Sequence, residues 1–210
     1  MKYYSLTNTT DVKKILFYPQ TDIFYENLAI DNNNNYYKNF VDNGRIKINN
    51  NSLATNLLDS SPVLSKGLVI DEKFKELLSE FTLPTHKYYK IPTTYKNKKL
   101  TFFWLNFVNS TRHLDFNNSY FKIINSIDYS VIGDLKIKSI DFYNRVNKSI
   151  SFEEQTKIFK LSMKDSFPKL DLISFNEINI KNLISEKLKK RLEEENITGI
   201  EVSETNLFKK

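Results

Sequence analysis

The sequence contains no cysteine, and this absence excludes disulfides, thiolate catalysis and cysteine-based zinc sites together. Glycine and proline are scarce, with four and five residues in a chain of 210. The four glycines are too scattered to form either common glycine-rich nucleotide-binding fingerprint. With only two histidines, the chain also has little to offer for metal binding or imidazole catalysis. No metal site and no cofactor is expected.

Long apolar runs are missing as well. The opening residues Met1–Ser5 lead into Thr, Asn, Asp and Lys rather than into the apolar core of a signal peptide. No run approaches the roughly 18 apolar residues that a membrane-spanning helix needs. We therefore expect a cytoplasmic protein without a membrane partner, which agrees with the lack of cysteine.

The net charge of +6 results from 31 basic and 25 acidic residues. Arginine is rare, and most lysines are interspersed with acidic or apolar residues. The densest basic run, Lys187 to Arg191, is followed at once by Glu193–Glu195, a pattern typical of a solvated helix face. A nucleic-acid partner is therefore not favoured, although the basic balance leaves a nucleic-acid-binding accessory protein open as an alternative.

What the chain does contain is enough apolar material for one core: 40% of its residues are hydrophobic, with 16 Phe and 12 Tyr. We expect a single domain over residues 1–210. Within it, residues 1–62 form an irregular, Asn-rich part with tracts at 31–35 and 49–51, and residues 63–210 form the core. Long loops are expected over residues 7–62.

One stretch occurs twice, as Ile70–Glu80 and again as Ile184–Glu194, at a constant offset of 114. The identical pairs are Ile70/Ile184, Glu72/Glu186, Lys73/Lys187, Lys75/Lys189, Leu78/Leu192 and Glu80/Glu194. Glu, Lys and Leu are common in surface helices, so a chance match is the alternative explanation. The prediction of a true repeat therefore rests on the matched apolar residues after the helices, Leu83/Ile197 and Tyr88/Val202. The chain is predicted to contain two related units, each a helix followed by a strand.

Each repeated helix has a start signal and an apolar stripe. Asp71 and Ser185 stand where an N-cap residue accepts hydrogen bonds from the first free N–H groups. Apolar residues then recur at spacings of three and four, so each helix is expected to pack on a sheet. The first helix should end before Pro84, and the second near Asn196, with Ile197 folding back.

Strands are predicted to outnumber helices. Residues 100–108 are apolar on both faces, with Leu100, Phe102 and Trp104 opposite Phe103, Leu105 and Phe107, as in a central strand. The segment 87–91, stopped by Pro92, should pair with it as an antiparallel hairpin. Further strands are expected at 2–6, 45–48, 120–127, 134–138, 158–163, 171–175 and 199–203. In 158–163 the alternation places Phe159, Leu161 and Met163 on the buried side. The fold class is α+β, with a few helices packed on a largely antiparallel or mixed sheet.

Candidate catalytic residues are few. His86 is expected to be a partly exposed loop residue, and Trp104 a core residue or, alternatively, a stacking platform. His113, Asp115 and Ser119 lie together after the central strand and could be read as a small hydrolase. Adjacency in sequence is not triad geometry, however, and Asp or Ser in such a loop more often caps a turn.

Three stretches resemble the large immunity-protein family of bacterial polymorphic-toxin systems usually numbered eleven. They are Leu68–Leu78, Leu114–Phe121 and Ile184–Glu201, and the last is the most specific. The likeness covers roughly residues 62–205, whereas the N-terminal third matches only in its opening strand. The chain departs from the family in its longer Asn-rich segment and in lacking the acidity common among nuclease inhibitors.

The resemblance implies a non-catalytic antidote that binds a cognate protein toxin encoded nearby and neutralises it by stoichiometric occlusion. It supplies no catalytic residues. Asp115, Phe116 and Ser119 fall on signature positions that either contact the partner or maintain the fold. Toxin contacts are expected where relatives differ, so the irregular 20–60 region is an equally good binding candidate. The oligomeric state is left open.

The charge of the chain bears on the identity of the toxin. Nuclease inhibitors tend to present acidic surfaces, because basic substrate clefts attract negative charge. This chain is basic overall, so we expect a toxin that is not a nuclease, or one met through a local acidic patch. Candidates for such a patch are Asp11, Asp22, Glu26, Asp31 and Asp42.

Overall fold

The computed structural model describes residues 2–25, 44–59, 67–108, 110–175, 178, 180 and 182–208. Its strands are β1 (Tyr3–Asn8), β2 (Thr21–Tyr25), β3 (Gly44–Ile48), β4 (Leu57–Leu58), β5 (Leu68–Asp71), β6 (His86–Tyr95), β7 (Lys98–Phe107), β8 (Tyr120–Asn125), β9 (Val131–Leu135), β10 (Glu154–Lys160), β11 (Leu172–Ile173), β12 (Asn182–Ser185) and β13 (Ile200–Glu204). The helices are α1 (Val12–Ile15), α3 (Glu72–Leu78), α4 (Ile140–Ser149) and α5 (Glu186–Glu194), with a 3₁₀ turn at Ser110–His113.

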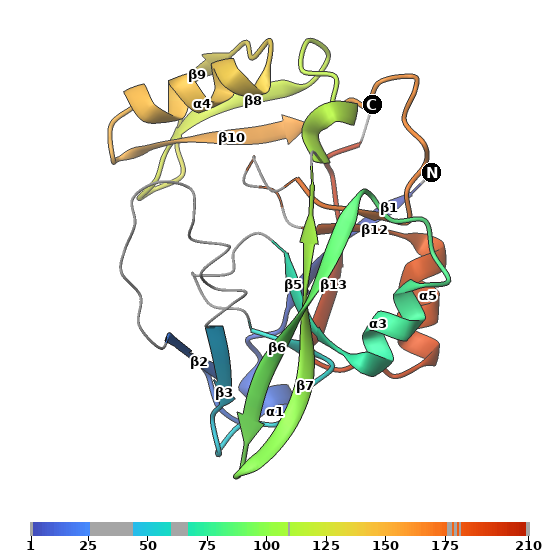
Figure 1. Ribbon diagram of the computed structural model, residues 1–210. Coiled ribbons are helices and arrows are strands. Elements are labelled where there is room, and N and C mark those ends of the chain that lie inside the picture. The colour runs from blue at the N-terminus through green and yellow to red at the C-terminus, as the bar shows by residue number, and fades with distance from the viewer. Residues whose placement is uncertain are drawn as a thin grey trace.

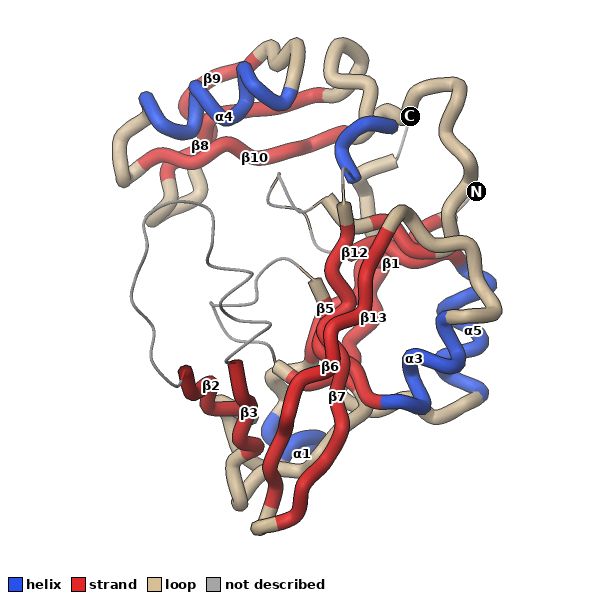
Figure 2. The backbone as a smooth tube through the Cα atoms, in the orientation of Figure 1, coloured by secondary structure: helices blue, strands red, loops and turns tan. Residues whose placement is uncertain are grey.

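These strands form three sheets (Figures 1 and 2). The orders are β2-β3-β6-β7-β5-β4, β11-β12-β1-β13 and β10-β8-β9. Among the pairings of described strands, only β3 with β6 is parallel. The predicted α+β class with a mixed, largely antiparallel sheet is confirmed. Within the described part of the chain, none of the helices is both long enough and apolar enough to cross a membrane.

Strand β7 lies inside the six-stranded sheet and has a buried residue set on each face. Phe102 and Trp104 belong to one apolar cluster, and Leu105 and Phe107 to another, as the two-faced sequence pattern predicts. Trp104 is fully buried, which rules out the stacking platform. The β6–β7 hairpin is also confirmed, but Pro92 does not end β6. The strand pairs with β7 on both sides of the proline, so Pro92 removes one donor without breaking the ladder.

The repeat predicted at offset 114 exists as two equivalent packed units. In the first unit (β4, β5, α3, β6 and β7), β5 leads directly into α3, which is followed by β6. In the second unit (β11, β12, α5 and β13, with β1), β12 leads into α5, which is followed by β13. Both predicted N-caps are confirmed: Asp71 accepts from the N–H of Phe74, and Ser185 from the N–H of Leu188.

Strand pairing shows that the equivalence extends beyond the two helices. In the first unit β7 runs between β5 and β6, and in the second unit β1 runs between β12 and β13. Ile70 pairs with Phe103, and its counterpart Ile184 pairs with Tyr4. Tyr88 pairs with Leu105, and its counterpart Val202 pairs with Leu6. Strand β1 therefore occupies the same position in the second unit as β7 occupies in the first.

The two units share one hydrophobic core. A single cluster joins the apolar stripes of α3 and α5 with inward residues of both sheets. Leu78 and Leu192, at equivalent positions, are each only 1% exposed. Asn196 adopts a left-handed conformation at φ 52°, and Ile197 is buried behind it, as predicted for the end of the second helix.

The β8–β9–β10 sheet, with α4 lying over it, forms the upper part of the molecule in Figure 1. Here the sequence predictions are partly wrong. The strand expected at 134–138 ends at Leu135, and α4, capped by Ser139, was not predicted. Phe159 is 40% exposed rather than buried, because the register of β10 against β8 shifts between Ile158 and Lys160.

The N-terminal part is more regular than expected where it is described. It supplies β1 to the four-stranded sheet and β2, β3 and β4 to the six-stranded sheet. The turn predicted at 49–51 is present, with the Asn49 side chain accepting from the N–H of Asn51 at 2.9 Å. The Asn-rich tract at 31–35 lies outside the described residues.

Candidate interaction surfaces

The signature position Asp115 organises a tight loop between the 3₁₀ turn and β8. Its carboxylate accepts hydrogen bonds from the backbone N–H (3.2 Å) and the side-chain amide (2.7 Å) of Asn118. These bonds hold the pKa of Asp115 below its usual value. Asp115 is therefore engaged in capping its own turn, the structural role that Asp commonly has in such loops.

Ser119 and Phe116 attach the same loop to its surroundings. The Ser119 hydroxyl donates to the carbonyl of Asp115 at 2.6 Å and accepts from the N–H of Ser162 at 3.0 Å. The ring of Phe116 stacks on buried Phe121, with centroids 6.2 Å apart. All three signature residues thus fasten this loop to β8 and to the segment after β10.

His113 does not join Asp115 and Ser119 in a catalytic arrangement. Its Nε2 atom faces Arg112 Nε at 2.9 Å, and its ring meets the ring of Phe167 edge-on. Burial, with the positive charges of Arg112 and Lys164, lowers the pKa of His113. Because the Ser119 hydroxyl is directed to backbone groups, the contacts of these described residues supply no base-to-nucleophile relay, and the hydrolase alternative loses its geometric support.

The other histidine also has a local role. His86 is partly exposed as predicted, but it begins strand β6 and pairs with Phe107 rather than lying in a loop. Its Nδ1 lies 2.7 Å from the carbonyl oxygen of Pro84. Within the described residues, no group of three or more His, Asp or Glu side chains is arranged to hold a metal ion.

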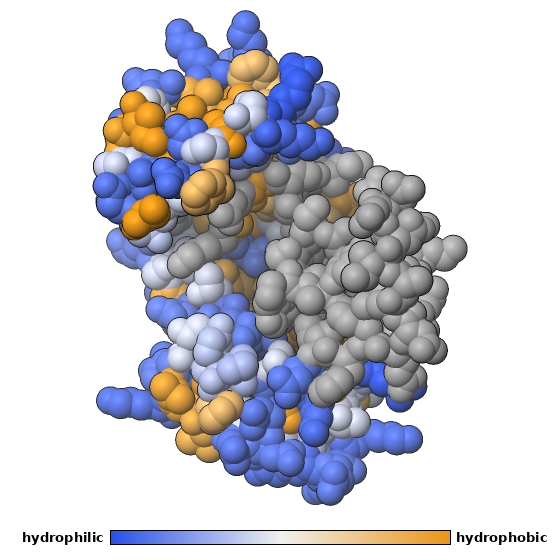
Figure 3. Space-filling model, turned by 90° about the vertical axis from the view of Figure 1, so that its left-hand side faces the viewer, coloured by the Kyte–Doolittle hydropathy of each residue, from blue (hydrophilic) through white to orange (hydrophobic). Residues whose placement is uncertain are grey.

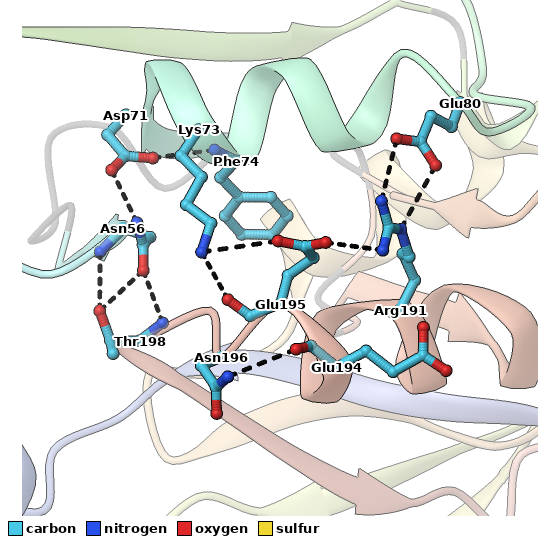
Figure 4. A network of polar contacts seen from close by, with 10 residues as sticks. All are labelled: Asn56, Asp71, Lys73, Phe74, Glu80, Arg191, Glu194, Glu195, Asn196 and Thr198. Carbon is cyan, nitrogen blue, oxygen red and sulfur yellow. Dashed lines mark hydrogen bonds and ion pairs between the residues drawn. The ribbon is translucent and has the colours of Figure 1, made fainter.

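The basic run of α5, predicted to be a solvated face, takes part in packing between the two units (Figure 4). Arg191 lies 3.3 Å from the carboxylate of Glu80, which follows α3 in the first unit. It also lies 2.6 Å from the carboxylate of Glu195, which follows α5 in its own unit. Lys187 lies over the ring of Phe81. Part of this charge is therefore used within the molecule rather than offered to a partner.

Large apolar side chains are exposed mainly on the small sheet. Of twelve such exposed residues in the described part of the chain, seven lie between 120 and 159. We call them the exposed apolar face: Tyr120, Ile127, Tyr129, Val131, Ile132, Phe152 and Phe159. Phe152 is 90% exposed and Ile127 72%. Figure 3 shows hydrophobic residues gathered over this upper part of the molecule, among hydrophilic ones.

Lysines are interleaved with the aromatic rings of the exposed apolar face. Lys122 lies over the rings of Tyr120 and Phe159, and Lys157 over those of Tyr129 and Phe159, at 5.2 to 5.8 Å from the centroids. Tyr120 also donates a 2.6 Å hydrogen bond to Asp134. The rings are thereby held in a surface that is both apolar and positively charged.

A smaller exposed apolar group surrounds α1, where Val12, Leu16, Phe17, Tyr18 and Leu53 are each at least 38% exposed. Of the proposed acidic patch nearby, Asp11 caps α1 and Asp22 is exposed on β2. Glu26, Asp31 and Asp42 lie outside the described residues.

Sequence reasoning missed the exposed apolar face, although a signal was present. Ile127, Tyr129 and Phe152 lie in turns flanking β8, β9 and β10, where polar residues are the rule. Apolar residues in turns are not needed by the core and therefore indicate another use. Comparison with protein-family models finds no match to this sequence, and comparison with curated proteins finds none either.

Proposed function

We propose that this chain is a cytoplasmic immunity protein, which binds a cognate bacterial toxin encoded nearby and neutralises it by stoichiometric occlusion, without catalysis of its own. The three stretches that resemble the immunity-protein family support the proposal. The observation that carries it is the exposed apolar face. Contiguous exposed apolar surface on a folded domain commonly marks a site of protein association.

The arrangement of this face suits binding to a folded protein. Tyr120 and Phe159 meet at 6.4 Å between ring centroids, so their rings present a preformed surface. Phe152 lies at the turn that Ser126 fastens through its hydroxyl, which donates to the Phe152 carbonyl at 3.3 Å. Aromatic residues with restricted side chains are the usual anchors of protein interfaces. The signature residues Asp115, Phe116 and Ser119 then act by holding the loop that leads into this sheet.

The test is co-expression with the product of the gene immediately upstream. We expect the chain to restore growth and to form a one-to-one complex on size exclusion. The paired change Phe152→Ser with Ile127→Ser should abolish both, because it removes two anchors that the fold does not bury. Phe17→Ser, at another exposed phenylalanine, is the matched control and should retain both. Absence of rescue and of a complex with the unchanged chain would refute the proposal.

A second candidate function is nucleic-acid binding, favoured by the lysines above the aromatic rings of the same face. Single-strand binders combine positive charge with rings on which bases stack. Binding of this kind must weaken steeply as salt increases. Titration of labelled single-stranded DNA and RNA at low and high salt decides between the candidates, since negligible binding at low salt excludes nucleic acid as the partner.

A further inference from the structure

A second surface lies on the far half of the six-stranded sheet, away from the exposed apolar face. It is a concavity of about 750 Å³ over β3, β6 and β7, which we call the basic groove. Its described lining includes Arg45, Lys47, Lys90 and Lys99, and no carboxylate is among those lining residues. The neighbouring acid in the strand register is Asp22 on β2, which pairs with Lys47.

Strand register places these cations on one face. Lys90 pairs with Phe103, Lys99 with Thr94, and Thr94 also with Lys47 on the neighbouring strand. Since residues paired across strands share a face, this is the face that carries Phe103 towards α3 and the shared core. One part of this sheet face is covered by α3 and belongs to the shared core. The basic groove is the part of the same face that α3 does not cover.

Between the cations, the same sheet face presents Pro92, Thr94 and Thr101. Leu100, which also borders the groove, packs with Phe102 and Trp104 on the opposite face of the sheet. Lys47, Lys90 and Lys99 are exposed. Aromatic rings, on which nucleic-acid binders stack bases, are absent from the described lining. A group of exposed cations on one sheet face is complementary to a row of carboxylates.

We propose that the basic groove binds an extended acidic segment of a protein partner, one with Asp or Glu at every second residue. In an extended chain this two-residue repeat places all of these carboxylates on one side, towards the lysines. It also offsets the repulsion among the clustered cations. This inference does not rest on the proposed function, because the groove and the exposed apolar face belong to different sheets.

The experiment uses the full chain and three fluorescein-labelled probes in anisotropy titrations. They are a twelve-residue peptide alternating Glu and Leu, the same peptide with Lys in place of Glu, and a twelve-nucleotide oligo(dT). We expect saturable binding of the Glu peptide that weakens with salt, and no binding of the Lys peptide. Tighter binding of oligo(dT) than of the Glu peptide, or no binding of any probe, would overturn the proposal.

Charge-reversal variants locate the site. Lys90→Glu with Lys99→Glu should weaken binding of the Glu peptide about tenfold or more. Lys136→Glu with Lys148→Glu makes the same change of charge at exposed positions near the small sheet and should leave binding within about twofold, since surface charge far from a site acts weakly at physiological salt. Equal losses in the two variants would show a non-specific charge effect and overturn the assignment. Thermal unfolding of each variant checks that the fold is retained.

Discussion

Asn56 and Asp171 hold equivalent places in the two units, and each bonds the cap of its own helix and the loop after the other helix. The Asn56 amide donates to Asp71 at 2.7 Å, and its oxygen accepts from the Thr198 N–H at 2.8 Å (Figure 4). The Asp171 carboxylate accepts from the Ser185 hydroxyl at 2.7 Å and from the Thr82 N–H at 3.0 Å. These reciprocal bonds fasten the two units together.

Asp171→Ala should therefore destabilise the protein. Asp171 is 8% exposed, and its removal leaves the buried Ser185 hydroxyl and the Thr82 N–H without their acceptor. We expect a loss of about 1–3 kcal/mol in the free energy of unfolding, measured by urea titration. Asp165→Ala, at an exposed aspartate, is the control and should change it by about 0.5 kcal/mol or less. Equal effects would contradict this role for Asp171.

The shared core predicts matched costs for its two equivalent leucines. Leu78→Ala and Leu192→Ala should each cost about 2–5 kcal/mol, because each leaves a cavity beneath its helix. Leu53→Ala, at a leucine that is 41% exposed, should cost far less. Denaturant unfolding of the three variants measures this difference. A small effect at either buried leucine would mean that its helix is not packed on the shared core.

Two glycines provide a test of close backbone approach. Gly199 has φ +80°, and a Cβ there would lie 2.1 Å from the carbonyl oxygen of Leu57. Gly199→Ala should therefore destabilise by more than about 1 kcal/mol. Gly133→Ala meets nothing within 4 Å and should stay within about 0.5 kcal/mol of the unchanged protein. Thermal and urea unfolding compare the pair, and similar losses would disprove the contact at Gly199.

The ion pair between the helices should contribute little. Arg191 is partly exposed and Glu80 is exposed, so Arg191→Gln is expected to cost about 0.2–1 kcal/mol, less in high salt. Lys190→Gln, at the exposed neighbouring position, removes the same charge without this contact. Unfolding titrations in 0.1 M and 1 M salt measure the difference. A cost at Arg191 that does not fall with salt would exclude the electrostatic explanation.

The buried Tyr3 hydroxyl should make the stability of the protein depend on pH in the alkaline range. Burial first, and then the charge of Asp171, raise its pKa to about 12, and its hydroxyl donates to the carbonyl of Leu170. The unfolded chain therefore loses this proton first as pH increases. The stabilisation is fully present below about pH 10, the ordinary tyrosine pKa, and is lost towards pH 12. In Tyr3→Phe the unfolding free energy should fall less steeply across this interval. An identical slope would contradict the prediction.

The sequence allowed the local parts of the fold to be predicted, because caps and apolar periodicity are properties of neighbouring residues. Asp71, Ser185 and the two-faced strand around Trp104 are examples. It could not show that β1 enters a sheet with β12 and β13, because strand pairing at long separation leaves no local pattern. The exposure of Phe159 was missed for a related reason: one register shift in β10 reverses which face its alternation presents.

The same limit applies to the candidate surfaces. Asp115 and Ser119 could be recognised as turn residues from their types and spacing. The exposed apolar face combines segments from 120 to 159, and the basic groove combines three strands, so only the folded chain brings their residues together. From the sequence, the basic residues were expected to be dispersed among acidic and apolar ones. The fold instead gathers several of them on one exposed sheet face, which no single run of sequence reveals.

The position of β1 has a consequence for the order in which the polypeptide can fold. All strands of the first unit are present once residue 107 has been synthesised, and its central hairpin is local. In the second unit β1 pairs with β12 and β13, so it has no partner strand in its sheet until residues 182–185 have been synthesised. Contacts of such long sequence separation form late, because closing the intervening loop costs entropy before any contact is gained. The two units, alike in their final packing, are therefore completed at different stages of synthesis.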